Sequence, residues 1–280
     1  MFTVSAELED LIDTTVSIPT IPTTMLQINK IIASAEGSAR ECGDVIVRDP
    51  AIATKLLRLV NSSFYALKNP VSSVPLACSL VGMKVIKNVV LQATVLDQFG
   101  VGTTIKGFDT KWLWDHSFKT AIAARMLAQA WPEAGLDKEE AYTCGLIHDV
   151  GKMMLLQNVP KRFEEALQVS MKNQIPLAKA EGEVFGFSHA HVAGLLAERW
   201  KLAPDLQIAV SYHHSPGTDA EEWAKGFLIH AANSIAHEEA IGNGGWIGDR
   251  CTPEELAAMH VPEATMVAIR EQVRQASMSS

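Results

Sequence analysis

Six side chains between positions 116 and 214 could bind metal ions. Each lies in a stretch that predicts a helix with that side chain on its inward face: His116, His148, Asp149, His189, His213 and His214. Imidazole and carboxylate groups are the ligands that zinc, iron and manganese take in proteins. Two ions that share such ligands can activate water for attack on a phosphate. Function therefore depends on whether these side chains meet and bind metal.

Helical periodicity predicts which histidines point inward. In the stretch 112–129, His116 falls on the apolar face that also carries Leu113, Thr120, Ala123 and Leu127. A helix that begins after Gly186, with Ser188 as its cap, places His189 on a face with Val192, Ala193, Leu196 and Trp200. His191 instead shares a face with Gly194 and Glu198. We therefore predict that His189 is a ligand and that His191 is not.

The paired ligands predict two more helices. The segment 141–157 is expected to form one helix with His148 and Asp149 in its middle. Lys152 lies four residues after His148 and three after Asp149, so it is expected on the same helix face. Another helix begins at position 204, where a proline suits the first helical residue, and it leads to the histidine pair at 213 and 214 before it ends at 216–217. Lys152 would thus add a cation beside the ligands.

A different interpretation applies to each histidine taken alone. A single buried histidine is more often a core imidazole that is bonded to a backbone carbonyl than a metal ligand. Five inward histidines with an aspartate favour metal, because uncharged imidazoles buried without partners would each cost free energy. We therefore expect one or two divalent transition-metal ions, with iron or zinc as the preferred metals. The site is expected to be either active or vestigial.

Motifs around these residues resemble a known family. The run from Gly145 to Lys152, with His148 and Asp149 at its centre, looks like the signature of the HD phosphohydrolase superfamily. Four further motifs make the match narrower, and they lie in this order: Ile18–Pro22, Val47–Ala51, Leu56–Ser62 and Gly186–His189. In that order they resemble the HDOD family, the output-domain branch of this superfamily. The similarity covers residues 18–240.

The resemblance implies an all-α fold, a multi-helix HD-like bundle with a helical N-terminal lobe. It also implies a role in bacterial signalling with no agreed enzymatic activity. Relatives that hydrolyse cyclic di-GMP carry a Gly-Tyr-Pro motif soon after the paired histidines, and this chain has no such motif. The same relatives place an aspartate where this chain has Asn233, whose neutral oxygen is a weaker ligand for a hard cation.

Two functions remain open. The first is a regulatory signal-transduction module that binds a partner protein or a nucleotide around an HD-type metal site. The second is a metal-dependent phosphohydrolase, in which Asp149 bridges the ions and Lys152 neutralises the phosphate. Asn233 and the missing Gly-Tyr-Pro favour the module. The complete histidine set with Asp149 and Lys152 favours the hydrolase.

Composition and charge limit the partners. The chain has 280 residues, of which 48% are hydrophobic and 20% charged, and a net charge of −8. This balance argues against nucleic acid as the main partner, because binding a duplex needs a basic face. The N-terminus lacks the pattern of a signal peptide and the chain lacks a membrane-spanning run, so a cytoplasmic protein is expected. The four cysteines form no metal-ligand spacing and are expected to be reduced: Cys42, Cys78, Cys144 and Cys251.

Glycines and caps indicate the organisation of the chain. Gly100, Gly102 and Gly107 interrupt the helical pattern just before the first ligand helix. We therefore predict a helical N-terminal lobe at 1–105, an HD-like lobe at 106–240, and a Gly-rich loop with C-terminal helices packed on that lobe at 241–280. Two capping boxes are expected, Ser38 with Glu41 and Thr252 with Glu255. The sequence does not indicate an oligomeric state.

Overall fold

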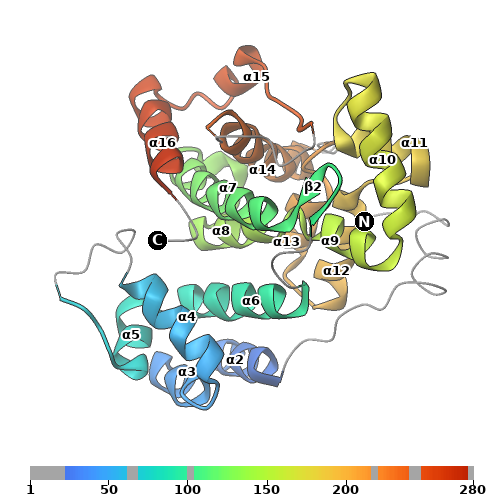
Figure 1. The fold of residues 1–280 in the computed structure, drawn as a ribbon. Coiled ribbons are helices and arrows are strands. Elements are labelled where there is room, and N and C mark those ends of the chain that lie inside the picture. Colours follow the sequence, from blue (N-terminus) through green and yellow to red (C-terminus); the bar gives the residue numbers. More distant parts are fainter. Residues whose placement is uncertain (1–22, 62–68, 100–103, 216–219, 240–246, 277–280) are drawn as a thin grey trace. The chain divides into compact units, whose positions relative to one another are not determined.

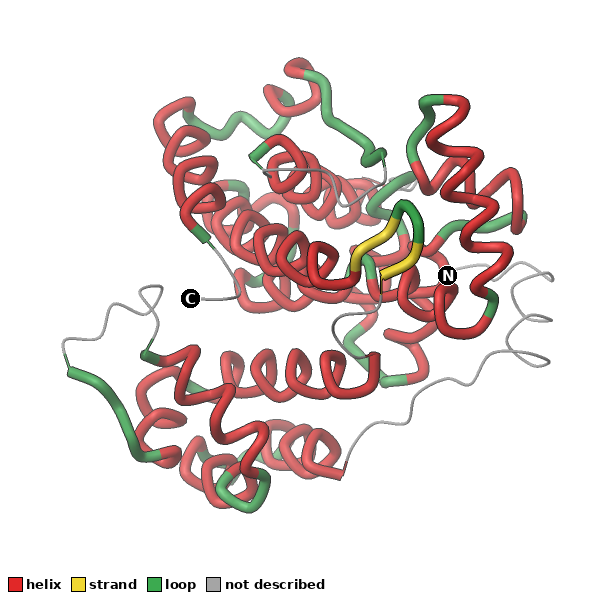
Figure 2. The backbone as a smooth tube through the Cα atoms, viewed as in Figure 1, coloured by secondary structure: helices red, strands yellow, loops and turns green. Residues whose placement is uncertain are grey.

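The computed structural model describes residues 23–61, 69–99, 104–215, 220–239 and 247–276. Most of these residues lie in helices, which confirms the expected all-α class (Figures 1 and 2). The strands β1 (Thr104–Ile105) and β2 (Phe108–Asp109) form one short antiparallel hairpin, in which Gly107 adopts a φ of 88°. No single described helix is long and apolar enough to cross a membrane; α5 and α6, described below, pass that test only as a pair bent by 119°. The chain divides into two compact units.

The first unit spans Pro19–Gly100, and its described part is a group of five helices. These are α2 (Thr23–Ala33), α3 (Ala39–Ile46), α4 (Pro50–Val60), α5 (Val74–Val81) and α6 (Met83–Phe99). The helices meet over an apolar core that contains Ile28, Ile46, Leu56 and Ile86. The predicted capping box at the start of α3 is confirmed, since Ser38 and Glu41 bond to each other's backbone N–H.

The Leu-Val-Asn motif of the first unit has a structural explanation. The Asn61 side chain donates to the carbonyl of Val71 at 2.8 Å and accepts the N–H of Val71 at 2.7 Å. This pair of bonds ties the end of α4 to the segment before α5. Part of the motif set falls outside the described residues, namely 18–22 and Ser62.

The described part of the second unit follows the first unit in the chain and contains the remaining described helices. Its first half comprises α7 (Thr110–Ala130), the 3₁₀ turn η1 (Pro132–Ala134), α8 (Lys138–Ile147), α9 (Val150–Asn158) and α10 (Pro160–Asn173). Its second half comprises α11 (Leu177–Phe185), α12 (His189–Arg199), α13 (Pro204–Ser211), α14 (Ala220–Glu238), α15 (Pro253–Ala257) and α16 (Glu263–Gln275). The long helix α7 packs against α8, α14 and α16 (Figure 1).

The second capping box is also confirmed, because Thr252 and Glu255 bond reciprocally at the start of α15. The three-part division at 105 and 240 stays a prediction. Residues 241–246 of the expected Gly-rich loop lie outside the described residues.

Candidate metal centre

The predicted ligands meet around the fully buried side chain of Asp149. On one side, its Oδ2 lies 2.6 Å from Nζ of Lys152, 3.4 Å from Nε2 of His148 and 3.7 Å from Nε2 of His116. These groups come from α9, from the residue before Asp149, and from α7. One carboxylate oxygen thus faces two imidazoles and an ammonium group.

The other oxygen of Asp149 faces a second group of histidines. Its Oδ1 lies 3.1 Å from Nε2 of His189 and 3.9 Å from Nε2 of His213. His214 completes this group, because its Nε2 lies 2.9 Å from Nε2 of His189. Each of these four residues offers one ligand atom, and the four atoms all lie within 4.8 Å of one another. All six predicted ligands therefore belong to one cluster, which is divided between the two oxygens of Asp149.

Two predictions about the helices that carry these residues are wrong. The segment 141–157 is not one helix, because α8 ends at Ile147 and α9 begins at Val150, with Asp149 in a non-helical conformation between them. The helix from Pro204 ends at Ser211, so the histidine pair lies in the turn after it. The predicted end at 216–217 falls outside the described residues.

Ring-to-backbone hydrogen bonds explain both turns. Nδ1 of His148 lies 2.8 Å from the carbonyl oxygen of Gly145, and Nδ1 of His213 lies 2.7 Å from that of Val210. In both cases the imidazole bonds a carbonyl three residues earlier, which satisfies a free acceptor at the helix end. The turn then directs Nε2 of each ring inward.

Close helix packing brings the separate ligands together. A Cβ on Gly151 would lie 2.0 Å from the carbonyl oxygen of His189, so glycine is required where α9 meets the start of α12. A side chain on Gly145 would collide with the backbone of Ala121, where α8 meets α7. Gly151 thereby sets the distance between Asp149 and His189, while Gly145 brings α8 against the helix of His116.

The orientation of two imidazoles indicates a cation. Because Nδ1 of His148 and of His213 donates to a carbonyl, Nε2 of each neutral ring carries a lone pair. Both Nε2 atoms are buried and have no hydrogen-bond partner. They lie 3.4 and 3.9 Å from the oxygens of Asp149, so acceptors face acceptors across the centre. A positive ion between these atoms removes the conflict.

Two further carboxylates support the second group of histidines. Oε2 of Glu181, on α11, lies 2.6 Å from Nδ1 of His189 and also accepts the backbone N–H of His189 at 2.7 Å. Oδ2 of Asp249 lies 2.6 Å from Nδ1 of His214. Such carboxylate–imidazole pairs fix the ring orientation and increase the basicity of the opposite nitrogen, as they do at zinc sites.

Protonation in the absence of an ion follows from burial and neighbours. Burial alone would raise the pKa of Asp149, but adjacent His148 and Lys152 hold the pKa well below its usual value. Burial lowers the pKa of His148, and it lowers the pKa of His213 to well below the ordinary range. The pKa of His189 is raised, because burial is outweighed mainly by Glu181. Without metal, the charged form of His189 is therefore favoured relative to that of a free imidazole.

The two neighbouring histidines of α12 have different surroundings, in agreement with the predicted helix phase. His189 is buried in the cluster. His191 is only partly buried, and its Nδ1 accepts the backbone N–H of Ser188 at 3.1 Å. His191 therefore takes part in capping α12.

Sequence reasoning missed four residues that touch the centre or its ligands. They are Glu181, His230, His237 and Asp249. Nδ1 of His230 lies 2.8 Å from the carbonyl oxygen of His213, and the His237 ring lies 4.2 Å from that of His116. The spacing on α14 could have indicated His237, since it follows His230 by seven residues. No sequence signal indicated Glu181 or Asp249, which lie 8 and 35 residues from their partners.

Asn233 lies on α14 one turn from His230 and one turn from His237. Its side chain is buried, and its Oδ1 has no hydrogen-bond partner. Position 233 thus presents a neutral oxygen on the helix face that borders the cluster.

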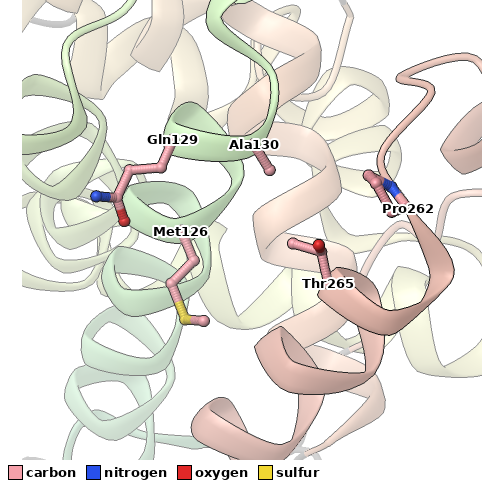
Figure 3. A pocket seen from close by; sticks show the side chains of 5 residues that line it. All are labelled: Met126, Gln129, Ala130, Pro262 and Thr265. Carbon is pink, nitrogen blue, oxygen red and sulfur yellow. The ribbon is translucent and has the colours of Figure 1, made fainter.

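A pocket of about 410 Å³ lies elsewhere, between α7 and α16 (Figure 3). It is lined by Met126, Gln129, Ala130, Pro262 and Thr265. Met126 follows His116 by ten residues on one helix, which separates them by about 15 Å. None of the lining side chains is ionisable, so this pocket offers no groups for acid–base or metal chemistry.

Comparison with known proteins identifies related sequences. The profile of the HDOD domain family matches residues 18–216. An uncharacterized protein of Treponema pallidum is 26% identical over 221 residues, which cover 78% of this chain and 41% of that protein. The chain thus spans less than half the length of this relative.

Solved structures share the fold. An HDOD domain protein of unknown function from Geobacter sulfurreducens is 21% identical, with a TM-score of 0.76, over 95% of this chain and 96% of that one. A candidate phosphohydrolase from Shewanella amazonensis is 20% identical, with a TM-score of 0.71, over 96% and 93%. A candidate signal transduction protein from Marinobacter aquaeolei is 21% identical, with a TM-score of 0.73, over 97% of this chain and 58% of that one.

Proposed function

Because the chain belongs to the HDOD domain family, we propose that it is a regulatory signal-transduction module built around a metal-binding His–Asp centre. The residues that would hold metal are His116, His148, Asp149, His189, His213 and His214. A bound transition metal would supply a Lewis acid there. The mostly imidazole donor set suits iron or zinc.

The main observation behind this proposal is that buried imidazole nitrogens and carboxylate oxygens, all of them hydrogen-bond acceptors, face one another. Nε2 of His148 and Nε2 of His213 both face Asp149 and have no hydrogen-bond partner. Leaving such groups unpaired in the interior costs roughly 1–3 kcal/mol each. A resident ion would turn this cost into a stabilising contribution, because its binding free energy adds to that of folding.

Burial supports a module rather than a phosphohydrolase. Asp149 is 0% exposed and Lys152 is 2% exposed, so the two groups that would act on a phosphate are sealed from solvent. The neutral Asn233 and the missing Gly-Tyr-Pro motif point the same way. The proposed output is therefore binding, to a signalling partner protein or to a nucleotide. Similarity in fold to a candidate signal transduction protein is consistent with this role.

A phosphohydrolase is the second candidate, favoured by one contact. Nζ of Lys152 lies 2.6 Å from Asp149, where an ammonium group could neutralise a phosphate that had entered the centre. Asp149 and Lys152 would then be the catalytic residues.

Metal content tests the proposal directly. Protein purified without an affinity tag and without chelator should contain iron or zinc by elemental analysis. Replacing His148 and Asp149 together by Ala should remove that metal. A double variant that retains metal at the wild-type ratio would show that the ligand assignment is wrong.

A pair of substitutions on α12 provides a matched control. His189→Ala should lower metal content and thermal stability. His191→Gln should leave metal content unchanged, because Gln at this position of a capping box can still bond the backbone of Ser188. Equal metal loss in both variants would mean that the centre is sensitive to any change in α12 and that His189 has no special role.

Turnover separates the two candidate functions. Metal-loaded protein should leave cyclic di-GMP and generic phosphodiesters intact through prolonged incubation, as followed by chromatography. If the metal-loaded protein hydrolyses either compound and Asp149→Ala abolishes the reaction, the hydrolase replaces the signalling-only function.

A further inference from the structure

We infer that the centre holds one tightly bound metal ion, on the Oδ1 side of Asp149, and that Lys152 takes the place of a second ion on Oδ2. The ligands of this ion are Oδ1 of Asp149 and Nε2 of His189, His213 and His214. His116 and His148, on Oδ2, would hold only a second, much weaker equivalent. This inference rests on the proposed metal-binding function and goes beyond it, because it assigns the number of ions and their position.

The Oδ1 group has the ligands of a complete four-coordinate site. Metal–ligand bonds of about 2.1 Å place tetrahedral ligand atoms about 3.4 Å apart. Nε2 of His189 lies 2.9 Å from Nε2 of His214 and 3.1 Å from Oδ1 of Asp149, and Nε2 of His213 lies 3.9 Å from the same oxygen. These distances bracket the tetrahedral value. The Oδ2 group offers two imidazoles besides the shared carboxylate.

Both outer carboxylates bond imidazoles of the Oδ1 group. Glu181 bonds Nδ1 of His189 and Asp249 bonds Nδ1 of His214, each at 2.6 Å. On the other side, Nδ1 of His148 bonds a backbone carbonyl, a weaker acceptor than a carboxylate. His189 and His214 are therefore the stronger donors toward a metal, whereas His213, like His148, bonds a backbone carbonyl.

On the Oδ2 side, other interactions occupy the place of a second ion. Lys152 lies 2.6 Å from Oδ2, so a dication bound there would be repelled by an ammonium group that uses the same oxygen. Asn233 adds no negative charge. The ring of His116 is stacked on Trp112, with centroids 5.2 Å apart and planes at 5°, as expected for a packed core side chain.

The balance of charges in the centre also indicates one metal ion. Three carboxylates touch the centre or its ligands, those of Asp149, Glu181 and Asp249. One dication together with the ammonium group of Lys152 neutralises them. A second dication would leave two excess positive charges in a buried site, which is strongly unfavourable.

A cobalt titration tests the inference on the whole protein. Metal-free protein is titrated with Co²⁺, and bound ions are counted by visible absorption and by elemental analysis after dialysis. We expect one tight equivalent per chain and a second that binds at least 100-fold more weakly. Two equivalents of equal affinity would overturn the inference and leave the proposed metal-binding function intact. Failure to bind any ion would overturn both.

Two alanine variants locate the ion. His214→Ala should change the Co²⁺ spectrum and weaken the tight equivalent at least 100-fold, whereas His116→Ala should retain the wild-type spectrum and affinity. The opposite pattern would place the ion on Oδ2 and refute the assignment. If either variant fails to fold, the wild-type titration still tests whether the centre holds one tight ion or two.

The remaining variants test the supporting groups. Lys152→Met should strengthen the second equivalent at least tenfold, since it removes the competing positive charge at similar side-chain volume. Glu181→Gln should weaken the first equivalent roughly tenfold or more, as is typical when the partner of a ligating histidine is lost. A second equivalent that stays weak in Lys152→Met would contradict the role given to Lys152.

Discussion

The two units of the chain bury different kinds of side chain. Among the described residues of the first unit, the buried polar side chains are Asn88 and Thr94, and neither carries a charge. The second unit buries a cluster of imidazoles, carboxylates and an ammonium group around Asp149. Apolar burial stabilises a fold without any ligand. A buried ionic cluster stabilises it only when its charges and lone pairs are matched, so the second unit is expected to depend on metal and the first is not.

Removal of metal should give the largest difference between the units. An ion present at 1,000 times its dissociation constant stabilises the folded state by about 4 kcal/mol. For a unit of this size, chelation should lower Tm by roughly 8–16 °C. Calorimetry with and without chelator measures the shift, and hydrogen exchange shows where protection is lost. Loss of protection in α2–α6 to the same degree as in α7–α14 would contradict the comparison.

A cavity in the first unit should have the complementary effect. Leu56 is fully buried among α2–α6, and Leu56→Ala should cost about 2–5 kcal/mol of stability. Metal content should remain that of the wild type, because no ligand lies in this unit. Urea unfolding and elemental analysis measure the two quantities. A Leu56→Ala protein that has lost its metal would show that the units are coupled.

Acid should weaken the metal-free second unit. Burial lowers the pKa of His237 to about 3, and it lowers the pKa of His148 as well. Such histidines bind more protons when unfolded, so their contribution to stability is present above the unfolded pKa of about 6.5 and is lost as pH falls below it. His189 has a raised pKa and opposes this trend, with a contribution that is present below pH 6.5 and lost as pH rises through its folded pKa.

More of the buried histidines have a lowered pKa than a raised one, so chelator-treated protein should lose stability between pH 6.5 and 5. Each lowered histidine contributes up to about 1.4 kcal/mol per pH unit. Urea midpoints at pH 7.5, 6.5 and 5.5 follow the loss. Midpoints that rise toward acid would mean that His189 dominates.

A single carboxylate should have the smallest effect. Asn233→Asp adds a negative charge to the helix face beside the cluster and should tighten binding of a second metal ion by up to about tenfold, or about 1.4 kcal/mol. The gain should grow as pH rises, because competing protons leave the imidazoles. Asn88→Asp is the matched control in the first unit, where the same change should leave the metal titration unaltered. Equal titrations of Asn233→Asp and wild type would show that position 233 is not a ligand position.

Local sequence patterns were sufficient for much of the fold. The capping boxes at Ser38 and Thr252 could be predicted because a cap and its partner lie three residues apart. The inward phase of His116 and of His189 followed from apolar neighbours on the same helix face, and both side chains are buried. The pairing of an imidazole with a carboxylate at 148–149 and the similarity to the HDOD family required nothing beyond the sequence.

Tertiary structure alone decided how these residues are divided between the two oxygens of Asp149. The helix break at Asp149 depends on a ring-to-carbonyl bond and on the approach of α12 to Gly151, and helical periodicity contains neither. Glu181 and Asp249 reach their histidines only through the packing of α11 and of the segment before α15. The sequence by itself determined which groups could bind metal, because side-chain chemistry and helix phase are local. Only the fold decided which oxygen of Asp149 each group faces, because those distances arise between segments that are far apart in the chain.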